Sequence, residues 1–367
     1  MNPIYLDNQA TTPLAPEVFD AMLPWLKDNF GNPHSPHVIG RQAAAAVEVA
    51  REQVAALLPK NGRVIFTGSA TEAINLAMGA ARARPGRDQI AVVDTEHAAV
   101  RDTTLWYQTQ GFETTLLPVD HEGLVDLEEL EACLGSKTAL VGAMLVNNEI
   151  GVIQPVAKIA DMAHSAGALL LCDAVQGFGR VDLPAEADLI ALSGHKIYGP
   201  KGIGALWVRD GVELPPLIHG GGQEQGVRSG TLSPALCVGM GTAARLCGER
   251  RQADMAHIEG LAEKARSLFA DWTVNGSLEQ RYAGNLNIRR DGLDVARLMS
   301  DVRGVAFSAG SACASGSGRP SHVLAALGLE PAQIKSSIRL GFGRYNSIDE
   351  VEQAARLINE AAGKQLS

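Results

Sequence analysis

Short apolar runs alternate with longer amphipathic stretches between residues 63 and 208. Runs of this length without interruption by charge are typical of strands that are buried on both faces of a parallel sheet. We expect strands at residues 63–66, 90–93, 114–119, 139–146, 168–173, 188–193 and 204–208. Helical patterns lie between many of them, at residues 70–83, 98–110 and 155–165. The alternation predicts an α/β fold with a mostly parallel central sheet.

A second region follows, with a different pattern. Proline and glycine accumulate near residues 215–226, and a long helical stretch then runs from Ser233 to about Trp272. Strand patterns return at NLNIRR, GVAFSAG and SSIRLGFG, before a final helix near residues 349–363. We therefore expect a large domain at 14–250, and a smaller α/β domain built from 1–13 and 251–367.

Composition narrows the class of protein. The 367 residues are 46% hydrophobic and 20% charged, as in an ordinary soluble globular protein, and the net charge of −9 argues against non-specific nucleic-acid binding. No apolar run is long enough to span a bilayer, and the first residues do not resemble a secretory leader. We expect a cytoplasmic protein with no nucleic-acid or membrane partner. The five cysteines form no CxxC pair, so neither a disulfide framework nor a metal site is expected.

Lys196 is the first candidate for chemistry. It follows the apolar run 188–193 and precedes a turn rich in glycine and proline. A lysine at the end of a buried strand either extends its amine to solvent or is desolvated and becomes nucleophilic, which suits imine formation.

Four other polar side chains also follow predicted strands, and ligands gather at the carboxyl ends of parallel strands. Asp173 is either a helix N-cap or a carboxylate partner for a protonated ring nitrogen, and Gln176 is either a surface amide or a donor to a ring oxygen. His97 is either structural or a stacking and proton-transfer group, and Asn148 is either a turn residue or a donor to a ring oxygen or substrate carboxylate.

The segment 66–71 supplies a candidate phosphate site. A strand end leads through Gly68, Ser69 and Ala70 to Thr71, where a helix begins, and free N–H groups at a helix N-terminus bind anions. A plain N-cap turn is the alternative. Ser193 and His195, which lie just before Lys196, add possible donors to the same phosphate. Together these parts are what pyridoxal 5′-phosphate requires.

The chain resembles the class I cysteine desulfurases of the NifS/IscS type, within the class V aminotransferase family of fold-type-I pyridoxal-phosphate enzymes. The resemblance covers nearly the whole chain. The motifs that carry it are YLDNQATTP (5–13), FGNPHS (30–35), ATEAINLA (70–77), TEHAAV (95–100), VNNEIGV (146–152), DAVQGFG (173–179), SGHKIYGPKGIGAL (193–206), GGGQEQGVRSGT (220–231), SAGSACASGS (308–317) and SSIRLGFGR (336–344).

The resemblance implies that Lys196 binds the cofactor as an imine, while Asp173, Gln176 and His97 contact its ring. It implies phosphate contacts from Ala70, Thr71, Ser193 and His195.

It further implies that Thr231 reaches the phosphate of a neighbouring subunit in a homodimer with shared active sites. Asn148 and Arg339 would bind the substrate carboxylate, a task for which a guanidinium is also suited on its own chemistry.

Cys313 is the residue that would carry out the sulfur transfer that the resemblance implies. It lies in a run of glycine, serine and alanine at 308–318, which favours a loop over a packed element. The expected reaction takes sulfur from L-cysteine, giving L-alanine and a persulfide on Cys313. The sulfur would then pass to an acceptor protein, such as an iron–sulfur scaffold or a tRNA-thiolation factor.

Two alternatives compete with this function. The first is a selenocysteine lyase or another class V aminotransferase-like enzyme, which would not need Cys313. The second is a non-catalytic sulfur-relay partner, which would not need Lys196, Asp173 or His97.

Overall fold

The computed structural model describes residues 3–310 and 320–367. Its largest sheet has seven strands in the order β2-β8-β7-β6-β5-β3-β4. Within this sheet only β8 runs antiparallel to its neighbours, so the predicted mostly parallel α/β fold is confirmed. The strands are β2 (Gly62–Thr67), β3 (Gln89–Val93), β4 (Glu113–Leu117), β5 (Thr138–Met144), β6 (Leu169–Asp173), β7 (Leu189–Ser193) and β8 (Gly204–Arg209).

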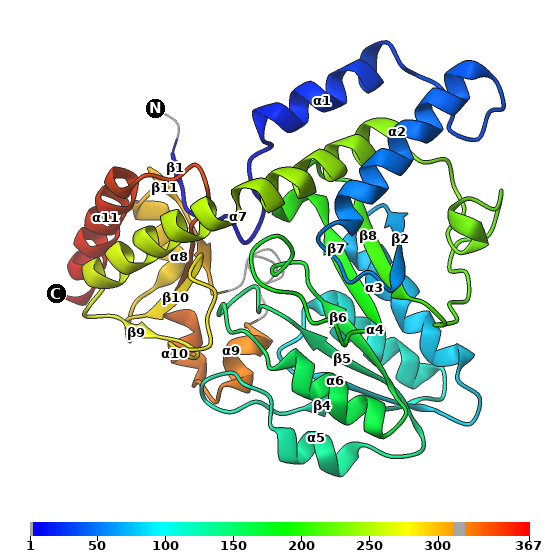
Figure 1. The fold of residues 1–367 in the computed structure, drawn as a ribbon. Helices are drawn as coiled ribbons and strands as arrows, with labels where there is room; N and C mark the ends of the chain where they lie inside the picture. Colours follow the sequence, from blue (N-terminus) through cyan, green and yellow to red (C-terminus); the bar gives the residue numbers. More distant parts are fainter. Residues whose placement is uncertain (1–2, 311–319) are drawn as a thin grey trace.

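Helices cover both faces of this sheet (Figure 1). Successive side chains of a strand point to opposite faces, so Val64 and Phe66 enter one hydrophobic cluster and Ile65 another. The first cluster includes residues of α1, α2, α5 and α6, and the second includes residues of α3, η1 and α4. These helices are α1 (Pro16–Lys27), α2 (Val38–Ala55), α3 (Ala70–Met78), η1 (Gly79–Ala83), α4 (Ala98–Thr109), α5 (Leu127–Cys133) and α6 (Val156–Ser165).

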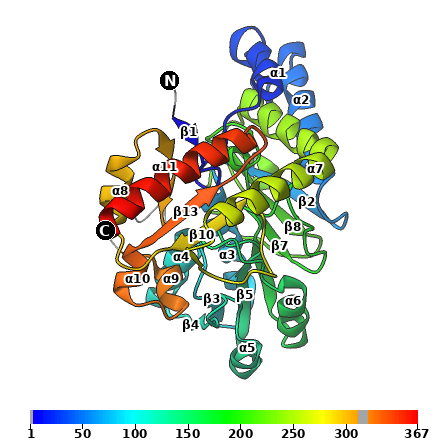
Figure 2. The same cartoon turned by 90° about the vertical axis from the view of Figure 1, so that its left-hand side faces the viewer.

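A smaller antiparallel sheet lies in the C-terminal part of the chain, in the order β12-β13-β10-β9. It has its own hydrophobic cluster, to which α8 and α11 contribute, and Figure 2 shows α11 lying across it. Beside it, β1 (Ile4–Tyr5) pairs in parallel with β11 (Val305–Ala306). The remaining elements are β9 (Thr273–Val274), β10 (Asn285–Arg289), α8 (Val295–Asp301), β12 (Ser308–Ala309), α9 (His322–Ala326), α10 (Pro331–Lys335), β13 (Ser337–Gly341) and α11 (Ile348–Leu366).

The long helix α7 (Pro234–Leu268) joins the two parts (Figure 1). Met240 in its first half belongs to the cluster of the large sheet, whereas Leu261 in its second half belongs to that of the small sheet. Gly241 lets α7 approach α2 closely, since a Cβ there would lie 2.6 Å from the Cα of Ala50. The domain division at residue 250 stays a prediction, and it would cut α7 where its contacts change from one cluster to the other.

All seven predicted strands of the large sheet are present, each within two residues of its expected bounds. The long helix begins as expected but ends at Leu268 rather than near Trp272. Helices α1 and α2 were not predicted. Among the described residues, no helix is long and apolar enough to cross a membrane.

Candidate active site

A cavity of about 590 Å³ lies at the carboxyl ends of the parallel strands. The residues that line it come from the ends of β2, β3, β5, β6 and β7, from the N-terminal segment and from β13. Ten of the twelve candidate site residues are among them: Ala70, Thr71, His97, Asn148, Asp173, Gln176, Ser193, His195, Lys196 and Arg339. Thr231 is exposed and does not line the cavity, and Cys313 lies outside the described residues.

Lys196 ends the short helix η2 (Gly194–Lys196), directly after β7. Its Nζ donates to the carbonyl oxygens of Gln9 at 2.5 Å and Ala10 at 2.8 Å, so the amine is held over the cavity rather than extended to solvent. The N-terminal segment is fixed in turn, because the backbone N–H and hydroxyl of Thr12 both donate to the carbonyl of His195 at 3.0 Å. A segment nearly 190 residues away along the chain therefore positions this lysine.

Asp173 is the last residue of β6 and is 3% exposed. No helix begins after it, so the N-cap interpretation is wrong; its Oδ1 accepts a hydrogen bond from the backbone of Val175 in a turn. Desolvation raises the pKa of this carboxyl, and the positive charges of His97 and Lys196 act in the opposite direction. The carboxylate therefore gains from any cation that enters the cavity.

The candidate phosphate turn begins α3. Ser69 is the N-cap, with its hydroxyl accepting from the backbone of Glu72 at 3.1 Å, and Ala70 and Thr71 form the first turn. Gly204 on β8 lets this turn sit close to the sheet, since a Cβ there would lie 2.5 Å from the carbonyl carbon of Ser69. The cavity end thus presents a helix N-terminus to an anion.

His195 and Lys201 also line the cavity. His195 Nδ1 lies 3.1 Å from the hydroxyl of Thr11. Burial, together with the charges of Lys196, Lys201 and Arg180, lowers the pKa of His195 to about 4. At neutral pH this imidazole is therefore uncharged and acts through its hydrogen bonds.

His97 caps the N-terminus of α4. Its Nδ1 accepts from the backbone N–H of Ala99 at 3.1 Å, so in the neutral ring the proton resides on Nε2. The preceding residue, Glu96, is fully buried, and its Oε1 accepts from the backbone of Met144 at 2.5 Å. Desolvation and the nearby Asp173 raise the pKa of Glu96 well above its usual range.

Arg339 enters the cavity from β13 and is 1% exposed. Its Nη2 donates to Asp7 Oδ1 at 2.7 Å and its Nη1 donates to the carbonyl of Asn148 at 3.0 Å. Its Nε, like Asn148 Oδ1, is buried without a hydrogen-bond partner among the described residues. Buried polar atoms are rarely left unpaired and both residues line the cavity, so these two atoms mark where a polar ligand would be bound.

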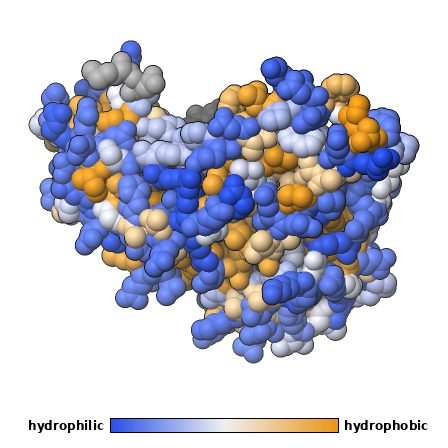
Figure 3. Space-filling view, turned by 45° about the horizontal axis from the view of Figure 1, so that its top comes forward, coloured by the Kyte–Doolittle hydropathy of each residue, from blue (hydrophilic) through white to orange (hydrophobic). Residues whose placement is uncertain are grey.

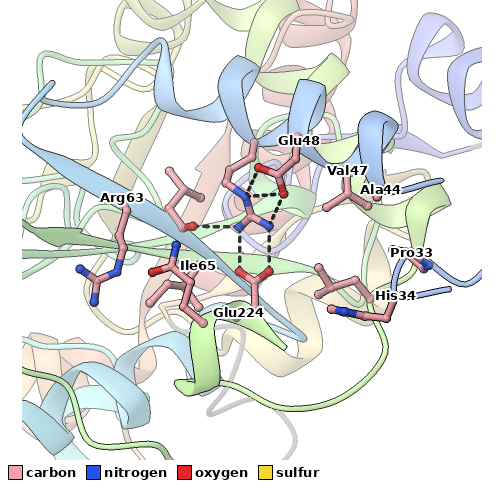
Figure 4. Close-up of a pocket in the computed structure, with 12 residues that line it drawn as sticks. Pro33, His34, Ala44, Val47, Glu48, Arg63, Ile65 and Glu224 are labelled. Atoms are coloured by element: carbon pink, nitrogen blue, oxygen red, sulfur yellow. Dashed lines mark hydrogen bonds and ion pairs between the residues drawn. The ribbon is translucent and has the colours of Figure 1, made fainter. Parts of the chain in front are cut away.

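The segment leading to Thr231 is anchored beside a second cavity of about 230 Å³ (Figure 4). Glu224, in η3 (Glu224–Gly226), forms a two-point ion pair with Arg51 at 2.7 and 2.8 Å and accepts from the backbone of Phe66 on the edge strand β2. Arg228 pairs with Glu72 at 2.6 Å in the first turn of α3. These ion pairs hold the segment against the edge of the sheet while Thr231 stays exposed.

Several residues of the site were not predicted individually. Gln9 and Ala10 contribute backbone carbonyls, which no side-chain pattern reveals, although they lie within the motif at 5–13. Lys201 lines the cavity, and Arg180 lies behind it and contacts Gln176 and Lys196. The sequence signal that could have indicated Arg180 is its position as a basic residue seven positions after the end of the predicted strand at 168–173.

The observed donor set fits pyridoxal phosphate. The cavity is lined by a helix N-terminus, by a buried carboxylate that gains from a cation, and by an amine. The unpartnered atoms of Arg339 and Asn148 would be satisfied by a polar ligand. The residues present therefore match the phosphate, the ring nitrogen and the aldehyde of this cofactor.

Comparison with known proteins agrees with this assignment. The family model of the aminotransferase class-V family matches residues 4–354. Cysteine desulfurase IscS of Rickettsia bellii (strain OSU 85-389) is 42% identical over 369 residues, covering 97% of this chain and 90% of the relative. A solved structure of a NifS-like protein superposes with a TM-score of 0.92 at 32% identity, covering 99% of this chain and all of the other.

A further solved structure, described as SspA in complex with cysteine, has a TM-score of 0.83 and 34% identity and covers 94% of this chain and 99% of that one. The family match spans nearly the whole chain, and the fold that it predicts is the one described above. The chain belongs to the pyridoxal-phosphate-dependent cysteine desulfurases of the aminotransferase class-V family.

Proposed function

We propose that this protein removes sulfur from L-cysteine and transfers it to Cys313 as a persulfide, with L-alanine as the other product. The observation that carries the proposal is the position of the Lys196 amine in a cavity that also contains the Asp173 carboxylate and the N-terminus of α3. The similar SspA structure, which holds cysteine, supports the choice of substrate.

Each part of the cavity would hold one part of the cofactor. Asp173 would accept a hydrogen bond from the ring nitrogen, Gln176 would donate to the ring oxygen, and His97 would lie against the ring face. Ala70, Thr71, Ser193 and His195 would hold the phosphate, and Lys196 would form the covalent link. When bound, pyridoxal phosphate supplies an aldehyde for imine formation and a ring that withdraws electrons from the substrate α-carbon.

The residues around the substrate have separate tasks. Arg339 would bind the substrate carboxylate through its unpartnered Nε and its remaining N–H groups, while Asp7 fixes the guanidinium from the other side. Asn148 would donate an N–H of its side-chain amide to the same carboxylate. Lys196, once displaced by the substrate amine, stays within the cavity and can move a proton from the substrate α-carbon.

Cys313 would act as the nucleophile, as a thiolate that attacks the substrate sulfur. An S–S bond forms as the Cβ–S bond breaks, and the electron pair of the broken bond remains with Cβ, which takes up a proton. The Cys313 sulfur is oxidised and Cβ is reduced, so no external oxidant or reductant is needed. The persulfide then carries sulfur to an acceptor protein.

Replacing Cys313 by serine tests this function directly. We expect sulfide release from L-cysteine in the presence of a thiol reductant to fall at least about 100-fold, because the hydroxyl cannot form a persulfide. Cofactor absorbance should be retained, since Cys313 has no proposed contact with the cofactor. The readouts are sulfide, alanine and the mass of the protein after a single addition of cysteine.

Cys133, a half-buried thiol in α5, provides the matched control, and Cys133→Ser should keep the activity. Full sulfide release by Cys313→Ser would contradict the proposal. Retained selenide release from selenocysteine by that variant would instead favour a selenocysteine lyase, and wild-type protein that binds no cofactor would favour a non-catalytic relay.

We also propose a homodimer with shared active sites. Thr231 is exposed beside a firmly anchored segment, as expected if it completes the site of a neighbouring subunit. The region of α1 and α2 exposes large apolar side chains, including Phe19, Leu23, Leu26 and Phe30, and Figure 3 shows apolar surface there, at the upper right. Monomers rarely leave apolar patches of this kind uncovered.

Sedimentation or light scattering should therefore give twice the chain mass at micromolar concentration. Combining Leu23→Glu with Leu26→Glu, which places two charges on the exposed face of α1, should shift the protein toward the monomer and lower its activity. A wild-type protein that is monomeric while fully active would refute the shared site.

We also propose which class of protein accepts the sulfur and that this protein is cytoplasmic. We favour an acceptor in iron–sulfur assembly or tRNA thiolation, in line with the resemblance to IscS-type proteins. The four described cysteines, Cys133, Cys172, Cys237 and Cys247, are free thiols, which suits the reducing cytoplasm.

A further inference from the structure

Arg180 lies in the turn region after β6, outside the set of residues that line the active-site cavity. It is 9% exposed, so its guanidinium is one of the few buried charges near the site. It is placed directly behind two of the lining residues, Gln176 and Lys196.

The contacts of Arg180 form a closed ring of hydrogen bonds. Its Nη1 donates to Gln176 Oε1 at 2.7 Å, and its Nη2 donates to the carbonyl of Lys196 at 2.6 Å. Gln176 Nε2 and Lys196 Nζ in turn share one acceptor, the carbonyl of Gln9, at 2.8 and 2.5 Å. One guanidinium therefore contacts both the Gln176 amide and the backbone of the lysine whose amine faces the cavity.

This geometry settles the orientation of the Gln176 amide. A guanidinium only donates hydrogen bonds, so the amide atom at 2.7 Å must be the oxygen. The NH₂ group then faces the Gln9 carbonyl and the cavity. One of its two hydrogens is used by Gln9, and the other is available to a ligand.

The charge of Arg180 has no carboxylate partner among the described residues, because no ion pair involves it there. The ring of Tyr282 lies against it at 5.4 Å. Asp254 lines the same small cavity as Arg180, but its carboxylate is bound by Arg344 at 2.6 and 3.0 Å.

The other titratable groups around Arg180 do not neutralise it either. Burial raises the pKa of Tyr198, Tyr282 and Cys247, so these three are uncharged at neutral pH. His195 and Lys196 are bases and cannot supply negative charge. Asp173 lines the cavity, and the charges of His97 and Lys196 act on its carboxyl.

We propose that Arg180 is a positioning residue for the cofactor, which orients the Gln176 amide toward the ring oxygen and stabilises negative charge on that oxygen from behind the cavity wall. The proposal rests on the proposed function. A buried cation without a counter-ion is costly, and an anionic ring oxygen next to Gln176 offsets that cost when the cofactor is bound. In the same way, Arg180 disfavours a proton on the nitrogen through which Lys196 holds the cofactor.

The test compares the visible absorbance of Arg180→Met and wild-type protein, both loaded with pyridoxal phosphate, over a range of pH. Methionine has a similar stem but no charge and no donors. We expect the midpoint of the absorbance titration to rise by about one pH unit, because a nearby positive charge is lost. We also expect cofactor to dissociate about tenfold more readily, which equilibrium dialysis measures.

Arg180→Lys is the matched variant, since it keeps the charge but cannot make the two-point contact. It should restore the midpoint almost fully while cofactor retention stays intermediate. The melting temperatures of the cofactor-free proteins measure the effect of each substitution on stability, separately from the absorbance midpoint and from cofactor retention.

The outcomes are distinct. If Arg180→Met melts at a lower temperature but titrates with the wild-type midpoint, Arg180 only packs against Tyr282 and the proposal is wrong. If Arg180→Met shows the raised midpoint and Arg180→Lys does not, the proposal is supported. Wild-type protein that binds no pyridoxal phosphate would overturn both the proposed function and this role of Arg180. If the wild type binds the cofactor and cleaves cysteine, the proposed function holds and the variants test the role of Arg180 alone.

Discussion

Lys196→Ala is expected to abolish both the visible absorbance of the protein and its turnover of L-cysteine. The amine is held over the cavity by the carbonyls of Gln9 and Ala10, and no other described amine occupies that position. Loss of the covalent link and of the proton-transfer group together should lower the rate of alanine formation at least about 10³-fold. The measurements are the absorbance spectrum after cofactor addition and the rate of alanine release.

Lys201, which lines the same cavity, is the matched control. Lys201→Ala should keep the absorbance band, because the amine that forms the link is still present. Its cofactor should dissociate more easily, since a positive charge near the phosphate end is lost. A Lys196→Ala protein with normal absorbance, or a Lys201→Ala protein without it, would mean that the lysine is assigned wrongly.

The cofactor-free Lys196→Ala protein should melt close to the wild type. The two lost hydrogen bonds leave the carbonyls of Gln9 and Ala10 beside an open cavity, where water can replace the amine. The loss of colour and activity would therefore report on chemistry rather than on unfolding. Circular dichroism during heating checks this point.

The convergence of Asp173 and Lys196 could be predicted because it follows from strand direction alone. β6 and β7 are neighbours and run in parallel, so residues that follow their carboxyl ends must meet at one edge of the sheet. The same argument brought His97 and Asn148 to the cavity after β3 and β5. Continuous apolar strands, covered on both faces, made the strand ends easy to locate.

Helices α1 and α2 could not be located in the same way. In α1, Val18 and Met22 pack against the core, but Phe19, Leu23 and Leu26 on another face are also apolar and exposed. Both helices precede β2, so the alternation of strands and helices that located the later elements did not mark them.

The supporting contacts of the site were also beyond prediction from the sequence. Gln9 and Ala10 act through backbone oxygens, and their partner lies nearly 190 residues away. Glu96 lies beside the predicted His97, but its burial and its bond to Met144 depend on how β3 and β5 pair. Most side chains that face the cavity were predicted from the motifs, whereas backbone contacts and residues behind the cavity depended on the three-dimensional packing.

Asp173→Asn is expected to lower activity without lowering the stability of the cofactor-free protein. The cofactor-free protein buries two carboxyl groups together, Asp173 and Glu96, and desolvation raises the pKa of both. A carboxyl with a raised pKa in the folded state binds more protons there than in the unfolded chain. Its contribution to the free energy of unfolding therefore falls as the pH rises from the unfolded pKa, about 3.9, through the raised folded pKa.

Asparagine removes this titration and still accepts the hydrogen bond from the backbone of Val175. Cofactor-free Asp173→Asn should therefore melt at or above the wild-type temperature near pH 7.5, with a flatter dependence on pH. Its activity should nevertheless fall about 10²–10³-fold, because an amide cannot stabilise a protonated ring nitrogen as a carboxylate does. Thermal melts over pH 5–8 and the kcat for alanine formation are the two measurements.

Glu96→Gln is the matched control for this pair. Glu96 is equally buried and close to Asp173 but does not line the cavity, and glutamine can keep the bond from the backbone of Met144. It should gain stability at neutral pH in the same direction, because burial raises the pKa of Glu96, while its kcat stays within about threefold of the wild type, because Glu96 does not line the cavity. If Asp173→Asn instead lowered stability and activity in parallel, its carboxylate would be a structural residue rather than the partner that the cofactor requires.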